Sequence, residues 1–283
     1  MKVSLANPIY DVVFKFLMED MRVAKIILSA LLKREVVELE VRPEYNRKDD
    51  WTLYRVDYDA RVRQEDGSLK SVILELHKTW LEADVLAYRK YLSKHYADVD
   101  CSESDSSIIA IYLLAHRVGS IEEPVLYVSN NTAYNYAGEM ITAGMPNAFI
   151  DSLQHESVIV QIPLFKGRND SKLERIMSAF DISGYGFYLD ENVTVEEKDF
   201  SDDPDLSYFL LRLLIISANT GVREAINTEN LYTKELRDYK LLSAKEDVII
   251  ATANAGILTD IKLTQSEIKL LNSISKENSA TAS

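Results

Sequence analysis

Two neighbouring segments of the chain alternate between apolar and polar residues with the period of two that half-buried β-strands show. Along residues 54–63, apolar side chains occupy every second position: Tyr54, Val56, Tyr58, Ala60 and Val62. The positions between them are charged: Arg55, Asp57, Asp59, Arg61 and Arg63. A second apolar-rich segment, residues 72–78, follows the turn sequence Glu65-Asp66-Gly67-Ser68, in which Asp-Gly supports positive φ angles. The pattern therefore predicts a β-hairpin.

The second strand of this hairpin also separates its side chains by face. Glu75 and His77 share one side of the pleat, whereas Leu74, Leu76 and Lys78 share the other. Carboxylates can thus converge from neighbouring strands, which is the arrangement that a hard divalent cation requires. We expect this carboxylate-bearing side to reach solvent.

The rest of the N-terminal part predicts a mixed α/β architecture. Asn7 and Pro8 suit the N-cap and first position of an amphipathic helix that runs to about Met18, and residues 23–32 continue with helical spacing. Residues 80–96 predict a third helix after the hairpin. Residues 107–114 are too apolar for a strand with one solvent-exposed face, so they predict a central strand that is covered on both faces.

The C-terminal part changes from strands to helices. Residues 124–128 and 157–162 predict two further strands, separated by a loop or short hairpin. From Ser171 onward the spacing is helical, and Asp202-Asp203-Pro204 predicts the start of another helix. Helical segments are expected to continue over residues 231–242 and 247–255, and the small, polar residues 273–283 predict a disordered tail.

Several of these segments together resemble a known family. Four motifs occur in order: Asn7–Met18, Tyr54–Asp57, Ile73–Lys78 and Tyr88–Leu92. With the later Ile159–Pro163 and Leu173–Ile176, they resemble the PD-(D/E)XK nucleases of the bacterial transposase-like, or recombination-promoting, branch. In that superfamily an Asp on one strand and Glu-x-Lys on the next hold Mg²⁺ and activate water. The resemblance covers roughly the first two-thirds of the chain.

This resemblance implies a fold and a function. The fold is α/β, with a restriction-endonuclease-like mixed sheet flanked by helices over residues 1–170 and a mainly helical region over residues 171–272. The function is that of a metal-dependent DNA endonuclease in recombination, mobile-element or defence biology. The alternative is a catalytically weakened nuclease-fold protein that binds DNA or a partner protein.

The resemblance also implies the site residues. Asp57, Glu75 and His77 are the expected catalytic residues, and Asp57, Glu75 and Asp11 are the expected ligands of Mg²⁺, with Mn²⁺ as an alternative metal. Three basic residues of the nearly neutral N-terminal part are expected to contact DNA phosphates: Lys78, Arg89 and Lys94.

His77 departs from the family pattern, which has Lys in the wider superfamily and commonly Gln in this branch. A neutral His can orient or deprotonate the attacking water, or bind a softer metal such as Mn²⁺. The other interpretation is a polar residue at a strand end that binds nothing. The sequence leaves both open.

The carboxylates have structural alternatives as well. Asp59 is interleaved with arginines, and we expect it in cross-strand ion pairs on a solvated face. Asp11 can equally form an i,i+4 pair with Lys15. Glu75 follows the apolar run Val72–Leu74, where a carboxylate without a metal or a donor would be costly, so a functional role is favoured.

Charge and composition narrow the class of partners. The net charge of −13 opposes DNA binding at long range, but residues 1–100 hold 17 Lys plus Arg against 18 Asp plus Glu, so the acidity lies in the C-terminal part. We expect that part to serve association, as a homo-oligomer or with a partner protein. The chain has one cysteine, no run that approaches a membrane span and no evident secretory leader, which together predict a cytoplasmic protein.

Overall fold

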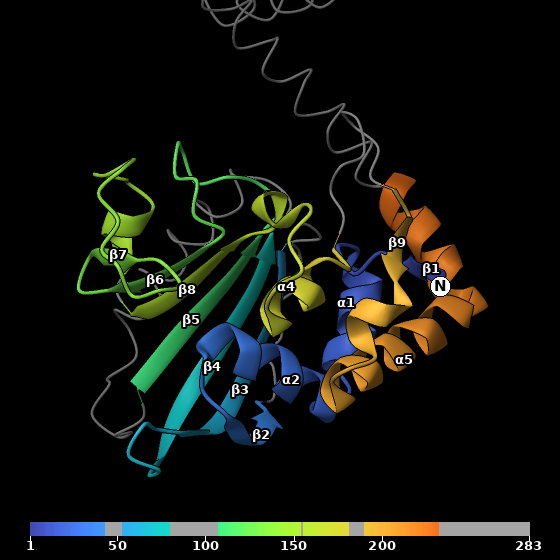
Figure 1. The fold of residues 1–283 in the computed structure, drawn as a ribbon, viewed down its shortest axis with the longest axis horizontal. Coiled ribbons are helices and arrows are strands. Elements are labelled where there is room, and N and C mark those ends of the chain that lie inside the picture. The colour runs from blue at the N-terminus through green and yellow to red at the C-terminus, as the bar shows by residue number, and fades with distance from the viewer. Residues whose placement is uncertain (43–52, 80–106, 154, 181–189, 232–283) are drawn as a thin grey trace, which may run out of the picture. The chain divides into compact units, whose positions relative to one another are not determined.

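The computed structural model describes residues 1–42, 53–79, 107–153, 155–180 and 190–231 (Figure 1). Within these residues, seven strands form one mixed sheet in the order β2-β3-β4-β5-β8-β6-β7. The strands of this sheet are β2 (Val36–Val41), β3 (Leu53–Arg63), β4 (Leu69–Thr79), β5 (Ser107–Leu114), β6 (Val125–Ser129), β7 (Thr132–Tyr134) and β8 (Glu156–Gln161). Helices flank the sheet, so the α/β class expected from the sequence is confirmed.

The predicted hairpin is present as β3 and β4, which pair antiparallel from Leu53↔Thr79 to Arg63↔Leu69. Its turn lies where the Asp-Gly pair stands. Gly67 has a φ of +83°, a backbone conformation that residues with a Cβ rarely adopt. The turn is closed by hydrogen bonds from the Gly67 amide to the Gln64 carbonyl (3.0 Å) and from the Ser68 amide to Asp66 Oδ1 (2.9 Å).

Strand β5 is the central, doubly covered strand that its apolar run predicts. It lies parallel to β4 on one side and to β8 on the other. Its side chains alternate between two hydrophobic clusters. Ile109, Ile111 and Leu113 belong to the larger cluster, and we call their side of the sheet the helix face. Ala110, Tyr112 and Leu114 belong to the smaller cluster, and we call their side the Tyr112 face.

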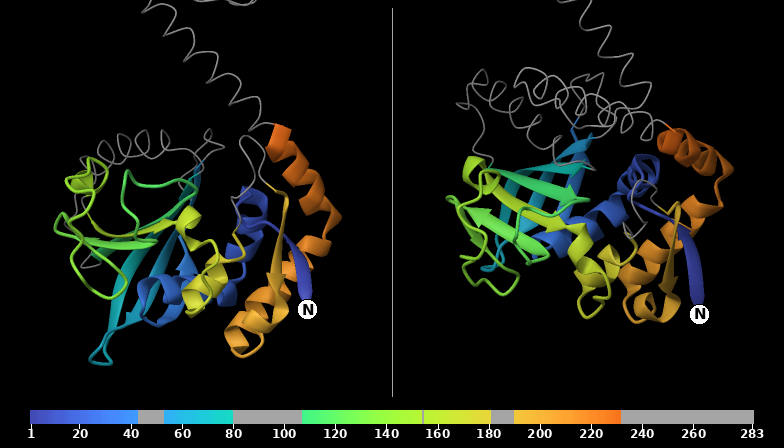
Figure 2. Two further views of the ribbon diagram at one scale, coloured as in Figure 1. Left: turned by 45° about the horizontal axis from the view of Figure 1, so that its top comes forward. Right: turned by 90° about the horizontal axis from the view of Figure 1, so that it is seen from above.

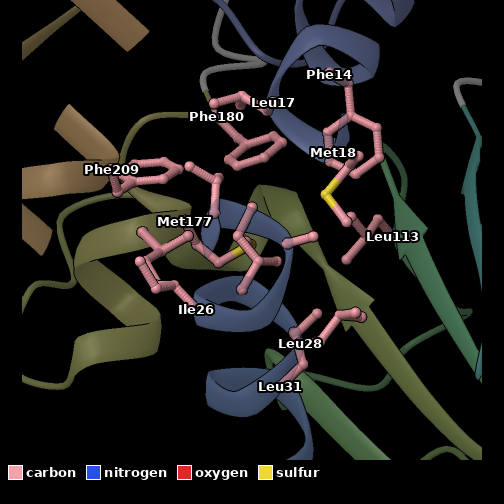
Figure 3. Close-up of a cluster of buried hydrophobic side chains, with 14 of the residues drawn as sticks. Phe14, Leu17, Met18, Ile26, Leu28, Leu31, Leu113, Met177, Phe180 and Phe209 are labelled. Carbon is pink, nitrogen blue, oxygen red and sulfur yellow. The ribbon is translucent and has the colours of Figure 1, made fainter. Parts of the chain in front are cut away.

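The helix face is packed by α1 (Asp11–Met18), α2 (Met21–Leu32), α4 (Lys172–Met177) and α5 (Pro204–Ala218). Figure 3 shows side chains from all four helices converging with Leu113 of the sheet. Local signals define several helix starts: Asp20 and Asp203 cap α2 and α5, and Ser171 forms a capping box with Glu174 in α4.

The first helix begins later than its sequence suggests. Residues 7–10 form a turn, because Asn7 Oδ1 accepts from the Ile9 amide (3.1 Å) and the Asn7 carbonyl accepts from the Tyr10 amide (3.2 Å). Asn7 therefore closes the turn that leads into α1, and Tyr10 occupies the N-cap position. The helix ends at Met18, as predicted.

A separate two-stranded ribbon was not anticipated from the sequence. Strand β1 (Lys2–Ala6) pairs antiparallel with β9 (Asn192–Glu196), and α5 lies beside it in both views of Figure 2. The Ala6 amide donates to Ser217 Oγ of α5 (2.7 Å). These contacts join the N-terminal strand to residues that lie about 190 to 210 positions later in the chain.

Short 3₁₀ helices complete the described fold: η1 (Ile150–Ser152), η2 (Ile162–Phe165) and η3 (Glu197–Phe200). Residues 220–231 are helical. The helix expected over residues 80–96 and those expected beyond residue 231 lie outside the described residues. Among the helices that are described, none has the length and apolar character needed to cross a membrane.

Candidate functional site

The β3–β4 hairpin brings Asp57 and Glu75 directly opposite each other. Side chains of directly opposed residues on antiparallel strands project to the same face, with Cβ atoms about 4.5–5.5 Å apart. Glu75 also pairs with Ala110 of β5, so both carboxylates belong to the Tyr112 face. The convergence of carboxylates that the alternation predicts is thus present in the strand register.

The two carboxylates differ in exposure. Glu75 is only 4% exposed, whereas Asp57 has intermediate exposure. The expectation that both reach solvent is therefore wrong for Glu75. Glu75 lies on an interior strand, with Asp57 of β3 and Ala110 of β5 beside it on the same face.

His77 lies in the same site as Glu75. Its Nε2 atom is 3.7 Å from Glu75 Oε2, close to but beyond good hydrogen-bond distance, and its side chain is fully buried. The imidazole stacks on the ring of Tyr112, with a centroid distance of 5.3 Å and an angle of 27° between the ring planes. His77 is thus buried between Glu75 and Tyr112.

Asp11 and Lys78 meet on the opposite side of the sheet. Lys78 is next to His77 in sequence, so its side chain projects to the helix face. Its Nζ donates to the Ile9 carbonyl (2.6 Å) and to the Asp11 carboxylate, and the side chain is fully buried. The structure therefore does not bring Asp11 to the Asp57–Glu75 pair, and Lys78 is not placed to contact a DNA phosphate.

Glu229, which no motif of the sequence indicates, lies beside this ion pair. Its Oε1 accepts from the Asp11 amide (2.7 Å) and its Oε2 from the Val12 amide (3.3 Å), so it satisfies the first amides of α1. Burial, reinforced by the charge of Asp11 and opposed by Lys78, raises the pKa of Glu229 to about 7. The two partners are 218 residues apart, and no local pattern could have connected them.

We expect Glu229→Gln to change how stability depends on pH. Because the pKa of Glu229 is raised from 4.5 to about 7, its stabilising contribution is complete below pH 4.5 and is lost as the pH rises through 7. Because glutamine does not ionise, the variant does not lose this stabilising contribution as the pH rises. Its unfolding free energy, relative to wild type, should rise by about 2–3 kcal/mol between pH 5 and pH 8, measured by urea unfolding.

The matched control for this experiment is Glu224→Gln, which alters an exposed carboxylate on the same helical segment. Its unfolding free energy relative to wild type should not change comparably over this pH range. Equal pH dependence in Glu229→Gln and wild type would contradict the assignment of Glu229.

Asp59 has the structural role expected from its neighbours. Its carboxylate pairs with Arg42 (3.3 Å), and similar ion pairs join Arg61 to Glu38 and Arg63 to Glu35 between β2 and β3. All of these side chains are substantially exposed, so each pair contributes little to stability. Asp57 of β3 therefore lies opposite Glu75. Asp59, Arg61 and Arg63 of the same strand instead form exposed ion pairs on the side of β2.

The carboxylates of Asp57 and Glu75 supply two of the ligands that a Mg²⁺ site needs. Mg²⁺ keeps several water ligands and is usually held by one or two carboxylates together with substrate phosphates, so Asp57 and Glu75 are chemically adequate protein ligands. No group of three or more His, Cys, Asp or Glu side chains that could hold a metal occurs in the part of the chain that the structure describes. Arg89 and Lys94, the other expected phosphate contacts, lie outside that part.

Comparison of the chain with protein-family models, with curated proteins and with solved structures found no match. Function is therefore inferred from the carboxylate site and from the short motifs of the sequence.

Proposed function

We propose that this protein is a metal-dependent DNA endonuclease of the transposase-like PD-(D/E)XK type, with a restriction-endonuclease-like fold. The observation that carries the proposal is the register of the hairpin, in which Asp57 stands opposite Glu75 and His77 follows on the same face. This is the order of the family motif, with His at the third position. A mixed sheet flanked by helices supports the proposal as well.

In the proposed reaction Asp57 and Glu75 would hold Mg²⁺ or Mn²⁺, which would supply Lewis-acid stabilisation of the charge on the phosphate and of the attacking water. His77, beside Glu75, accepts a proton from the water that attacks phosphorus, or orients that water. A phosphorus–oxygen bond of the DNA backbone then breaks, and the leaving oxygen takes up a proton.

A second candidate is a catalytically weakened nuclease-fold protein that binds DNA or a partner protein. Burial favours it, because Glu75 is 4% exposed and His77 is 0% exposed. Asp11, the third expected metal ligand, is engaged by Lys78 on the helix face. A cytoplasmic setting, self-association through the C-terminal region and a role in recombination, element mobility or defence belong to either proposal.

The experiment that separates these candidates is cleavage of plasmid and linear DNA with Mg²⁺, with Mn²⁺ and with EDTA. His77→Ala should lower the rate by roughly 10²-fold or more, and His77→Lys and His77→Gln should restore part of it, because each places a polar group near the attacking water. Since neutral imidazole suits Mn²⁺, wild type should favour Mn²⁺ over Mg²⁺ more than His77→Lys does.

A Glu75→Gln protein purified in parallel controls for contaminating nuclease. If wild type is inactive with both metals and His77→Lys gains activity, the site is disabled and the binding protein is the better assignment. If all His77 variants cut like wild type, His77 has no part in the mechanism.

A further inference from the structure

On the Tyr112 face, the imidazole of His77 in β4 contacts the ring of Tyr112 in the neighbouring strand β5. Strands β4 and β5 are parallel, and their register places His77 beside Tyr112 and Glu75 beside Ala110. On β5, the imidazole therefore has a large flat ring beside it, whereas Glu75 has the methyl group of Ala110 at the matching position. Strand register alone thus sets a different neighbour for each of the two site residues.

The contact between the two rings is well defined. A centroid distance of 5.3 Å and an interplanar angle of 27° correspond to an offset-stacked pair, the favourable arrangement for aromatic rings. Tyr112 is 3% exposed and His77 is fully buried. Stacking fixes the plane of the imidazole, and in this orientation the Nε2 edge faces Glu75 Oε2 at 3.7 Å.

Tyr112 is itself supported from the side away from the strands. The ring of Phe149 meets it edge-on, with centroids 5.5 Å apart and an interplanar angle of 82°. Phe149 stands at the start of η1, where Asn147 Oδ1 accepts from the amides of Phe149 (3.0 Å) and Ile150 (3.3 Å). The Asn147 turn therefore holds Phe149, Phe149 packs edge-on against Tyr112, and Tyr112 stacks on His77.

We propose that Tyr112 is a positioning residue, which holds the His77 imidazole at the angle that directs Nε2 toward Glu75 Oε2. This inference rests on the nuclease function proposed above. Its physical requirement is an aromatic ring at position 112 and not the phenol hydroxyl. A misplacement of about 1 Å in a reacting group can cost roughly 10²-fold in rate, so loss of the ring has a kinetic consequence beyond stability.

The test compares Tyr112→Leu with Tyr112→Phe in the full-length protein. Tyr112→Leu should lower kcat for DNA cleavage by roughly 10- to 100-fold with little change in KM, because DNA binding does not depend on the angle of the imidazole. Tyr112→Phe keeps the stacked ring and should retain kcat within about two-fold.

A spectroscopic measurement tests the same geometry without reference to activity. The chain has four histidines, and the ring signals of His77 in the ¹³C-histidine-labelled protein are identified by their loss in His77→Gln. Tyr112→Leu should move these signals, because the ring current of Tyr112 is removed, and Tyr112→Phe should leave them near their wild-type positions.

Leu126→Ala is the matched control for loss of core packing. Leu126 is fully buried in the same hydrophobic cluster as Tyr112, but β6 is separated from β4 by β8 and β5. It should destabilise the protein by about 2–5 kcal/mol without moving the His77 signals or lowering kcat of the folded enzyme.

The possible failures are distinct. Unmoved His77 signals in Tyr112→Leu, or wild-type kcat in that variant, overturn the positioning role. Equal loss of kcat in Leu126→Ala and Tyr112→Leu also overturns it, because the effect is then one of packing. A wild-type protein that cleaves no DNA overturns the proposed function instead, and the His77 signals still report whether Tyr112 holds the ring.

Discussion

Glu75→Gln is expected to abolish DNA cleavage, and Asp57→Asn is expected to do the same. Each substitution keeps the size of the side chain but replaces a carboxylate with a neutral amide, which binds a hard cation more weakly because it carries no negative charge. Loss of metal-assisted charge stabilisation worth several kcal/mol corresponds to roughly 10³-fold or more in rate. The measurement is the initial rate of plasmid nicking with saturating Mg²⁺ and, separately, Mn²⁺.

Asp59→Asn is the matched control for both substitutions. Asp59 is two residues from Asp57 on the same strand and pairs with the exposed Arg42, so it lies outside the proposed site. The control should cleave like wild type. Circular dichroism should show that all three variants remain folded. Wild-type rates in folded Glu75→Gln or Asp57→Asn would remove the carboxylate pair from the mechanism.

Lys78→Met is expected to destabilise the protein strongly. Methionine retains much of the apolar stem but leaves the Ile9 carbonyl and the Asp11 carboxylate without the ammonium donor. Lys78 is fully buried and the Asp11 side chain is 23% exposed, so the remaining charge is poorly solvated. The free energy of unfolding should fall by about 3 kcal/mol, measured by urea titration.

Two further variants test whether the loss of stability comes from the buried ion pair. Lys15→Met changes an exposed lysine of α1 and should alter stability by less than about 0.5 kcal/mol. Adding Asp11→Asn to Lys78→Met should recover part of the loss, because it removes the buried uncompensated charge. A Lys78→Met protein as stable as the Lys15→Met control would contradict the buried ion pair.

The hairpin could be predicted because its signals are local. Residue alternation along β3 and β4 assigns each side chain to a face, and the Asp-Gly turn sets which positions oppose each other. The alternation predicts that the carboxylates of the two strands converge, and the structure supplies the register that sets Asp57 directly opposite Glu75. The capping of α5 by Asp203 was predictable for the same reason, since the cap and the amides it satisfies are within three residues.

The partner of Asp11 could not be predicted in this way. Spacing along α1 offered Lys15, four residues away, and the family motif offered the metal. The observed partner, Lys78, is 67 residues distant and becomes available only when α1 packs on the helix face of the sheet. The same packing buries the Lys78 side chain and directs its Nζ to the Ile9 carbonyl and the Asp11 carboxylate.

The sequence by itself determined which side chains share a face, because the side-chain period of a strand is a property of the backbone. It therefore specified the hairpin, the covered central strand and the convergence of carboxylates from neighbouring strands. Only the tertiary structure decided which of those faces are buried and which distant groups meet: β1 with β9, Glu229 with the start of α1, and Tyr112 with His77. The physical reason is that burial and long-range pairing depend on how whole elements pack. The sequence around each of these residues contains no local pattern from which its distant partner could be predicted.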